Sequence, residues 1–126
     1  MRLKDKVAVV TGASSGMGRA IALAFAKEGA KVVAVARRKE MLDELVDEAK
    51  AFGGTIVAIQ GDVSQKSVNE HMIDYAVETF GSIDILVNNA GIVDQNMPVA
   101  ELSDELCERV LTVNLTGPMY ACRKAV

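Results

Sequence analysis

The sequence predicts an α/β protein built around a parallel β-sheet, and two observations carry that prediction. Four short apolar runs rich in β-branched residues alternate with longer stretches whose apolar residues recur at helical spacing. The runs are continuously apolar, as expected for strands buried on both faces of a sheet. Repeated strand-helix-strand units with short links favour parallel strands, right-handed crossovers and helices on both sides.

The four expected strands are short. They cover residues 7–10, 32–35, 55–59 and 83–87. The first two expected helices follow the first two strands. One spans residues 18–27 and ends at Gly29, which suits a left-handed cap. The other carries an apolar stripe from Met41 to Ala49, with charged residues opposite.

The third expected helix opens with Ser67 and Glu70, in the spacing of a capping box, and ends at Gly81. The fourth begins near Ser103. Its inner face is predicted to carry Leu106, Val110, Val113, Gly117 and Ala121.

Together these elements predict a Rossmann-type doubly wound parallel sheet of strand order 3-2-1-4. No internal repeat or linker divides residues 1–126, so we expect one domain. Nothing stops the fourth helix at Val126, and doubly wound folds usually continue beyond four strands. We therefore expect the domain to be incomplete at its C-terminus, truncated after the fourth helix.

Composition narrows the choice of partner. The chain of 126 residues is 50% hydrophobic and has a formal net charge of −3, which gives no electrostatic basis for binding nucleic acid. No apolar run approaches the roughly 20 residues that span a bilayer, so we expect a cytoplasmic protein without a membrane partner. His71 is the sole histidine, and no cluster of ligands surrounds it, so no metal site is predicted.

A glycine-rich turn links the first expected strand to the first helix. Gly12, Gly16 and Gly18 lie in the pattern Gly-x-x-x-Gly-x-Gly. Glycines at such a turn let the backbone approach a pyrophosphate, and the amides at the helix N-terminus supply donors and partial positive charge. The alternative is a tight turn with small residues for packing. No Lys-Ser or Lys-Thr follows, which excludes a nucleoside-triphosphate P-loop.

The end of the second strand indicates which dinucleotide is bound. An acidic residue there holds the ribose hydroxyl of NAD, whereas this chain has Arg37. Because an arginine pairs with a 2′-phosphate, the sequence favours NADP(H), with NAD still possible. The alternative is a solvated basic turn.

Four motifs in register carry a family resemblance. They are residues 11–18, the Gly-Asp-Val of residues 61–63, the Asn-Asn-Ala-Gly of residues 88–91 and the Thr-Val-Asn of residues 112–114. In order and spacing they resemble the classical short-chain dehydrogenase/reductases. The resemblance covers the whole chain and implies hydride transfer between NADP(H) and a small-molecule carbonyl or alcohol.

The resemblance also implies residue roles. Asp62 would accept a hydrogen bond from the adenine amino group, although turn formation ahead of Ser64 is an alternative that can hold at the same time. The Asn-Asn pair can equally be structural. The implied cofactor residues are Gly12, Ser14, Ser15, Gly16, Met17, Gly18, Arg37, Asp62, Val63, Asn89, Ala90 and Gly91.

Asn114 is the implied catalytic residue. An asparagine inside a helix is unfavourable, which indicates that it has a specific role there. In the family it joins Ser, Tyr and Lys and holds a water in a proton relay. Pro118 lacks an N–H, so the Asn114 carbonyl loses its helical donor and can accept from water. The alternative is a proline kink that serves packing.

The family's Ser and Tyr-x-x-x-Lys do not occur at the expected positions. Tyr120 and Lys124 have the spacing but lie on the same expected helix as Asn114, so they are not predicted to be catalytic. We therefore expect the chain to bind the cofactor but not to turn over substrate alone. The alternatives are a non-catalytic dinucleotide-binding module and an assembly fragment. A homo-oligomer is expected, because the edge of the fourth strand invites a partner.

Overall fold

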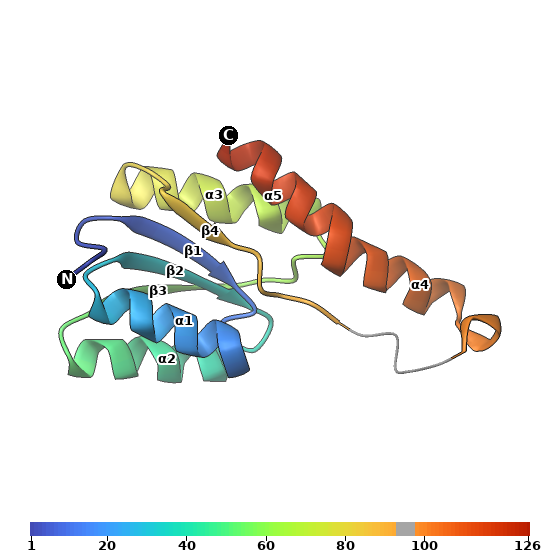
Figure 1. Cartoon of the computed structure of the whole chain (residues 1–126), viewed down its shortest axis with the longest axis horizontal. Helices are drawn as coiled ribbons and strands as arrows, with labels where there is room; N and C mark the ends of the chain where they lie inside the picture. The colour runs from blue at the N-terminus through green and yellow to red at the C-terminus, as the bar shows by residue number, and fades with distance from the viewer. Residues whose placement is uncertain (93–97) are drawn as a thin grey trace.

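The computed structural model describes residues 1–92 and 98–126 and confirms the predicted fold class. Its sheet contains β1 (Val7–Thr11), β2 (Lys31–Ala36), β3 (Thr55–Gln60) and β4 (Ile85–Val87). All neighbouring strands are parallel, in the order β3-β2-β1-β4 (Figure 1).

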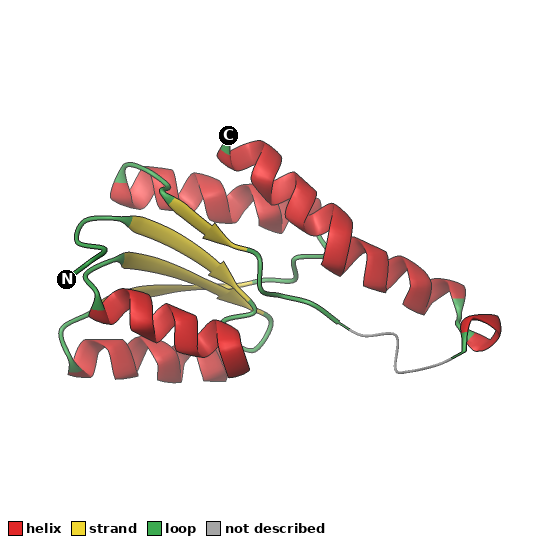
Figure 2. Ribbon diagram, in the orientation of Figure 1, coloured by secondary structure: helices red, strands yellow, loops and turns green. Residues whose placement is uncertain are grey.

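Helices cover both faces of the sheet (Figure 2). One face packs against α1 (Gly16–Lys27) and α2 (Lys39–Ala51). The other packs against α3 (Lys66–Phe80) and the C-terminal α5 (Gly117–Ala125), which contact each other. The 3₁₀ helix η1 (Val99–Glu101) and the helix α4 (Asp104–Leu111) precede a π-helical turn η2 (Thr112–Thr116), and Figure 1 shows α4 projecting beyond the strand tips. No helix within the described ranges is long and apolar enough to cross a membrane.

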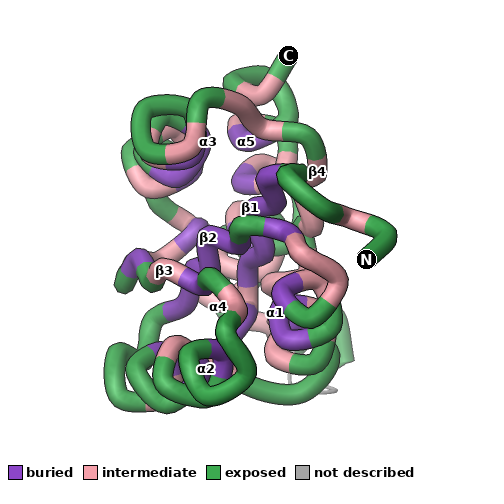
Figure 3. The backbone as a smooth tube through the Cα atoms, turned by 90° about the vertical axis from the view of Figure 1, so that its left-hand side faces the viewer, coloured by how far each residue is buried: buried purple, intermediate pink, exposed green. Residues whose placement is uncertain are grey.

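The alternation of side chains along β2 divides the core in two. Val32 and Ala34 belong to the cluster under α1 and α2. Val33 and Val35 belong to the cluster under α3 and α5. All four are fully buried, so the continuous apolar run of this strand serves two hydrophobic layers (Figure 3).

The fourth strand begins two residues later than predicted, at Ile85 rather than Ile83. Asp84 explains the difference. Its backbone N–H donates to the Val7 carbonyl at 2.9 Å, and its side-chain Oδ2 accepts from the Val7 N–H at 2.9 Å. The carboxylate thus takes the place of a backbone acceptor at the start of β1.

The capping-box prediction for the third helix was wrong. The helix begins at Lys66, its N-cap is Gln65 without a side-chain hydrogen bond, and Ser67 already lies inside it. The predicted start of the fourth helix near Ser103 is confirmed, and the structure adds a cap, because the Ser103 hydroxyl accepts from the Leu106 N–H at 3.1 Å. The left-handed conformation predicted at Gly29 is also confirmed, with a φ of 91°, and Gly81 at the end of α3 has a φ of 90°.

The predicted fourth helix is interrupted by the π turn that holds Asn114. The turn ends directly before Gly117 and Pro118. Proline cannot donate to the carbonyl four residues earlier, and its ring clashes with that carbonyl in a regular α-helix. A wider turn at this place relieves the clash, and the helix continues as α5.

We predict that Asp84→Ala lowers the free energy of unfolding by about 1–3 kcal/mol, because it removes the charged acceptor of the Val7 N–H. Urea unfolding measures the effect. Asp43→Ala, on the exposed face of α2, is the matched control and should change stability by about 0.5 kcal/mol or less. Equal stability of the two variants would contradict the prediction.

Candidate cofactor site

A cleft of about 280 Å³ opens where the carboxyl ends of the strands meet. This is the edge at which open α/β sheets bind ligands. Nine of the twelve predicted cofactor residues line it, and Gly16, Met17 and Gly18 lie at the adjoining first turn of α1. The lining comprises Gly12, Ser14, Ser15, Val35, Ala36, Arg37, Arg38, Gly61, Asp62, Val63, Asn89, Ala90, Gly91, Ile92, Arg109 and Val113.

Gly12 and Gly18 allow a close backbone approach beneath the cleft. Gly12 has a φ of 63°, and a Cβ on it would lie 2.9 Å from the Ala90 Cα. Gly18 is buried, and a Cβ there would lie 2.2 Å from the Gly12 carbonyl oxygen. Close packing therefore accounts for these two glycines, as the alternative interpretation of the turn predicts.

Gly16 differs from both. It has a φ of 58°, is exposed, and a Cβ on it would meet nothing within 4 Å. Packing therefore does not explain this glycine, and open space lies beside the first turn of α1. Ser15 is the N-cap but its side chain makes no capping hydrogen bond, and no acidic residue occupies the first turn. A helix N-terminus of this kind attracts anions.

Two arginines follow β2 at one wall of the cleft. Arg37 and Arg38 are both exposed, and the Arg37 carbonyl accepts from the Gln60 side chain at 3.2 Å. That bond ties the basic turn to the end of β3. Both arginines line the cleft at the end of β2, the place where the sequence predicts the 2′-phosphate.

Asn89 ties the end of β4 to the end of β1. Its side-chain amide donates to the Gly12 carbonyl at 3.3 Å, and its backbone N–H donates to the Thr11 hydroxyl at 3.1 Å. The Ala90 N–H donates to the same hydroxyl at 3.0 Å. The structural role considered for the Asn-Asn pair is therefore present at Asn89.

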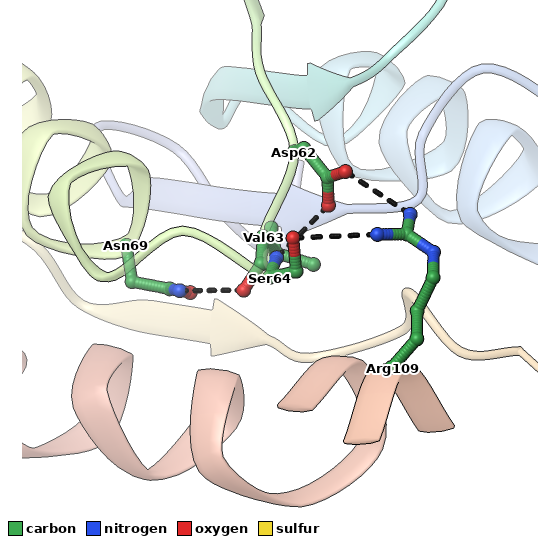
Figure 4. A network of polar contacts seen from close by, with 5 residues as sticks. All are labelled: Asp62, Val63, Ser64, Asn69 and Arg109. Atoms are coloured by element: carbon green, nitrogen blue, oxygen red, sulfur yellow. Dashed lines mark hydrogen bonds and ion pairs between the residues drawn. The ribbon is translucent and has the colours of Figure 1, made fainter. Parts of the chain in front are cut away.

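Asp62 is held from two sides (Figure 4). Its Oδ1 accepts from the Ser64 N–H at 2.9 Å, which forms the turn that the sequence gave as an alternative role. Its Oδ2 accepts from the Arg109 guanidinium at 3.0 Å. Burial alone would raise the pKa of Asp62, but the Ser64 N–H and hydroxyl and the Arg109 guanidinium outweigh it and lower the pKa below the usual 3.8.

Val63 is fixed from the other face of the same loop. The side chain of the buried Asn69 in α3 donates to the Val63 carbonyl at 2.7 Å. A Cβ on Gly117 would lie 2.6 Å from this oxygen, so the start of α5 also rests against the loop. The backbone after β3 is thereby held between α3 and α5.

Asn114 contacts the chain beyond β4. Its Oδ1 accepts from the Ile92 N–H at 2.8 Å, and its Nδ2 donates to the Ile92 carbonyl at 2.7 Å. Asn114 also lines a shallow hollow with Ala90, Gly91 and Ile92, next to the main cleft. Its side chain is thus engaged with the backbone.

Sequence reasoning missed Arg109 and Asn69. A signal for Arg109 was present, since it lies on the inward stripe of the last helical segment, three residues after Leu106 and four before Val113. Nothing local pointed to its partner. Tyr120 and Lys124 lie outside the cleft lining, and Lys124 pairs with Asp74 of α3 at 3.4 Å.

The lowered pKa of Asp62 predicts a pH-dependent contribution to stability. Because the pKa is lower in the folded than in the unfolded state, the contribution is present above the unfolded value of about 4 and is lost as pH falls through the lowered value. Wild type should therefore exceed Asp62→Asn in unfolding free energy near pH 7 by a margin that shrinks below about pH 4. Urea unfolding across pH measures it, with the exposed Asp47→Asn as control. A margin that stays constant down to pH 3 would contradict the assignment.

Comparison with known proteins agrees with this geometry. A family model described as short chain dehydrogenase matches residues 6–126. The 3β-hydroxysteroid dehydrogenase 2 of Eggerthella lenta is 43% identical over 124 residues, which cover 98% of this chain and 48% of that protein. The versicolorin reductase of Emericella nidulans is 42% identical over 125 residues, covering 98% and 47%. The chain spans about half the length of the curated relatives it matches.

Solved structures show the same fold. A metagenomic short-chain oxidoreductase in complex with NADP superposes with a TM-score of 0.93 at 34% identity, covering 98% of this chain and 56% of that one. Actinorhodin polyketide ketoreductase with NADPH gives a TM-score of 0.88 at 38% identity, covering 95% and 46%. Because the family model matches residues 6–126, nearly all of this chain, and the cleft is built from the motifs that suggested the resemblance, this chain belongs to the short-chain dehydrogenase/reductase family.

Proposed function

We propose that residues 1–126 form the dinucleotide-binding domain of an NADP(H)-dependent oxidoreductase that acts on a carbonyl or alcohol of a small-molecule substrate. The observation that carries the proposal is the cleft, which joins an open glycine turn at a helix N-terminus to an exposed pair of arginines. These are the donors that a pyrophosphate and a 2′-phosphate require.

The pyrophosphate would bind at the start of α1. Ser14 and Ser15 line the cleft and can donate hydroxyl hydrogen bonds, and the open side of Gly16 leaves space beside the backbone. Met17 is 71% exposed on the same turn. Arg37 would pair with the 2′-phosphate. The two solved relatives whose descriptions name NADP or NADPH support this preference.

The adenine would lie against the loop after β3. The pKa of Asp62 lies below the ordinary value for aspartate, which is itself far below 7, so its carboxylate is ionised at neutral pH and can accept a hydrogen bond from the adenine amino group. Val63, buried behind it, supplies an apolar surface, and Ala90 and Gly91 at the end of β4 leave room for the rest of the cofactor.

The bound cofactor would supply or accept the hydride. This chain would supply one part of the proton path. The Asn114 side chain is held by Ile92, and Pro118 cannot donate to the Asn114 carbonyl. That carbonyl oxygen would accept from a water in the relay. Asn114 is therefore the residue to which we assign a catalytic role.

Arg37→Ala should weaken NADPH binding by about 10- to 100-fold, because it removes a charge-assisted partner of the 2′-phosphate, and should leave NADH binding nearly unchanged. Titration calorimetry with both cofactors measures it. Arg123→Ala, an exposed arginine of α5 outside the cleft lining, is the matched control. An equal loss for both cofactors would show that Arg37 does not contact the 2′-phosphate.

The 126-residue chain by itself should bind NADPH without oxidising it in the presence of small ketones or aldehydes. Of the four residues in the family's catalytic group, the sequence supplies only Asn114 at its expected position. NADPH absorbance, followed over time across a panel of carbonyl compounds, tests this. Carbonyl-dependent oxidation that is lost in Asn114→Ala would overturn the expectation of inactivity. Binding without turnover is also the result expected of a non-catalytic module.

A further inference from the structure

Arg109 lines the cleft with a positive charge, and none of the cofactor roles proposed above is assigned to it. It extends from α4, which projects beyond the strand tips, back to the loop after β3 (Figures 1 and 4). Its Nη2 lies 3.0 Å from the Asp62 Oδ2, and its Nη1 lies 3.5 Å from the Ser64 hydroxyl. The arginine and aspartate side chains are 35% and 31% exposed, so the pair lies at the cleft surface and is only partly shielded from water.

The contacts restrain the Asp62 carboxylate while leaving it able to accept more. The Ser64 N–H donates to Oδ1 and Arg109 donates to Oδ2, and the Ser64 hydroxyl is a third donor. A carboxylate offers about four lone-pair sites, so acceptor capacity remains. Without the guanidinium, the carboxylate would keep only its bonds to Ser64 and would be free to turn about its side-chain bonds.

We propose that Arg109 is a positioning residue that orients the Asp62 carboxylate for the amino group of adenine and so sets the preference for adenine over a 6-oxo purine. This inference rests on the proposed function. At position 6, a purine with a carbonyl in place of the amino group presents an acceptor to the carboxylate, which is also an acceptor, while its neighbouring N1–H donor points in another direction. A mobile carboxylate can turn to accept from that N1–H, so an oriented carboxylate discriminates more strongly.

The residue type fits this role. The guanidinium is planar and charged at all relevant pH values, and its fork reaches two acceptors at once, here Asp62 and Ser64. A merely structural role, in which Arg109 only fastens α4 to the loop, would affect stability without affecting the choice of base. The two roles therefore differ in a measurable quantity.

The experiment compares binding of NADPH with binding of its hypoxanthine analogue, by calorimetry on the purified protein. The proteins are wild type, Arg109→Gln, Arg109→Lys, Asp62→Asn and the Arg109→Gln/Asp62→Asn double variant. Arg123→Gln is the control, because it removes an exposed arginine of α5 that does not line the cleft. Thermal unfolding of each variant reports whether it is folded.

In wild type and in Arg123→Gln, we expect NADPH to bind about tenfold or more tightly than the analogue, as for a hydrogen bond to a charged group. Arg109→Gln should reduce that ratio toward one, and Arg109→Lys should restore part of it. If Arg109 acts through Asp62, the double variant should show the same ratio as Asp62→Asn alone.

If folded Arg109→Gln keeps the wild-type ratio of NADPH affinity to analogue affinity, the inference is wrong. The same holds if the ratio rises because the carboxylate has been released. Either result leaves the proposed function intact. If the NADPH-to-analogue affinity ratio is lower in the double variant than in Asp62→Asn alone, Arg109 does not act through Asp62. Wild-type protein that binds neither compound would instead contradict the proposed function itself.

Discussion

The close approach of two backbone segments at the carboxyl end of β1 is the constraint on which the cofactor end of the molecule depends. A methyl group on Gly18 would lie 2.2 Å from the Gly12 carbonyl oxygen, which a real Cβ cannot do. Asn89 closes the same contact from β4, because its amide donates to that oxygen at 3.3 Å. The first turn of α1 therefore has a fixed position relative to the two central strands, and Gly16, where no packing demand exists, is left at the surface.

The helical segment formed by α4, η2 and α5 contacts both the loop that follows β3 and the chain that follows β4. Arg109 reaches the loop after β3, and Asn114 holds Ile92 after β4. Val113 and Gly117, four residues apart, lie on the same buried side of this segment, as residues at that spacing do in a helix. The π turn between α4 and α5 therefore relieves the clash at Pro118 without turning the buried side of α5 away from the sheet. The two roles considered for Pro118, a kink that serves packing and the loss of the helical donor to the Asn114 carbonyl, are compatible.

The parts of the fold that were predictable depend on local pattern. Apolar runs and helical stripes are properties of neighbouring residues, and they predicted the strands, the helices and the layers. The strand order was predicted from the Rossmann-type fold to which those elements were assigned. The misplaced start of β4 and the missed Arg109 arose where a distant group takes over a local role, whereas the capping-box error is a local shift of the helix start to Lys66. The start of β4 depends on Asp84 bonding to Val7, 77 residues away, and no periodicity encodes that distance. The same holds within the cleft, where Arg109 lies 47 residues from Asp62, although its charge on an inward helical stripe signalled an unseen partner.

Asp62 shows why a structural and a recognition role need not compete at one residue. The Ser64 N–H and the Arg109 guanidinium each occupy one oxygen, and they hold the pKa of the partly buried carboxyl below its usual value despite the opposing effect of burial. A lower pKa means that the group stays an acceptor, and fixed neighbours mean that its free lone pairs keep one direction. Turn formation thus prepares the carboxylate for a donor in the cleft. Removing either neighbour would change the orientation of the acceptor before it changed its charge at neutral pH, because even the ordinary pKa of aspartate lies far below 7.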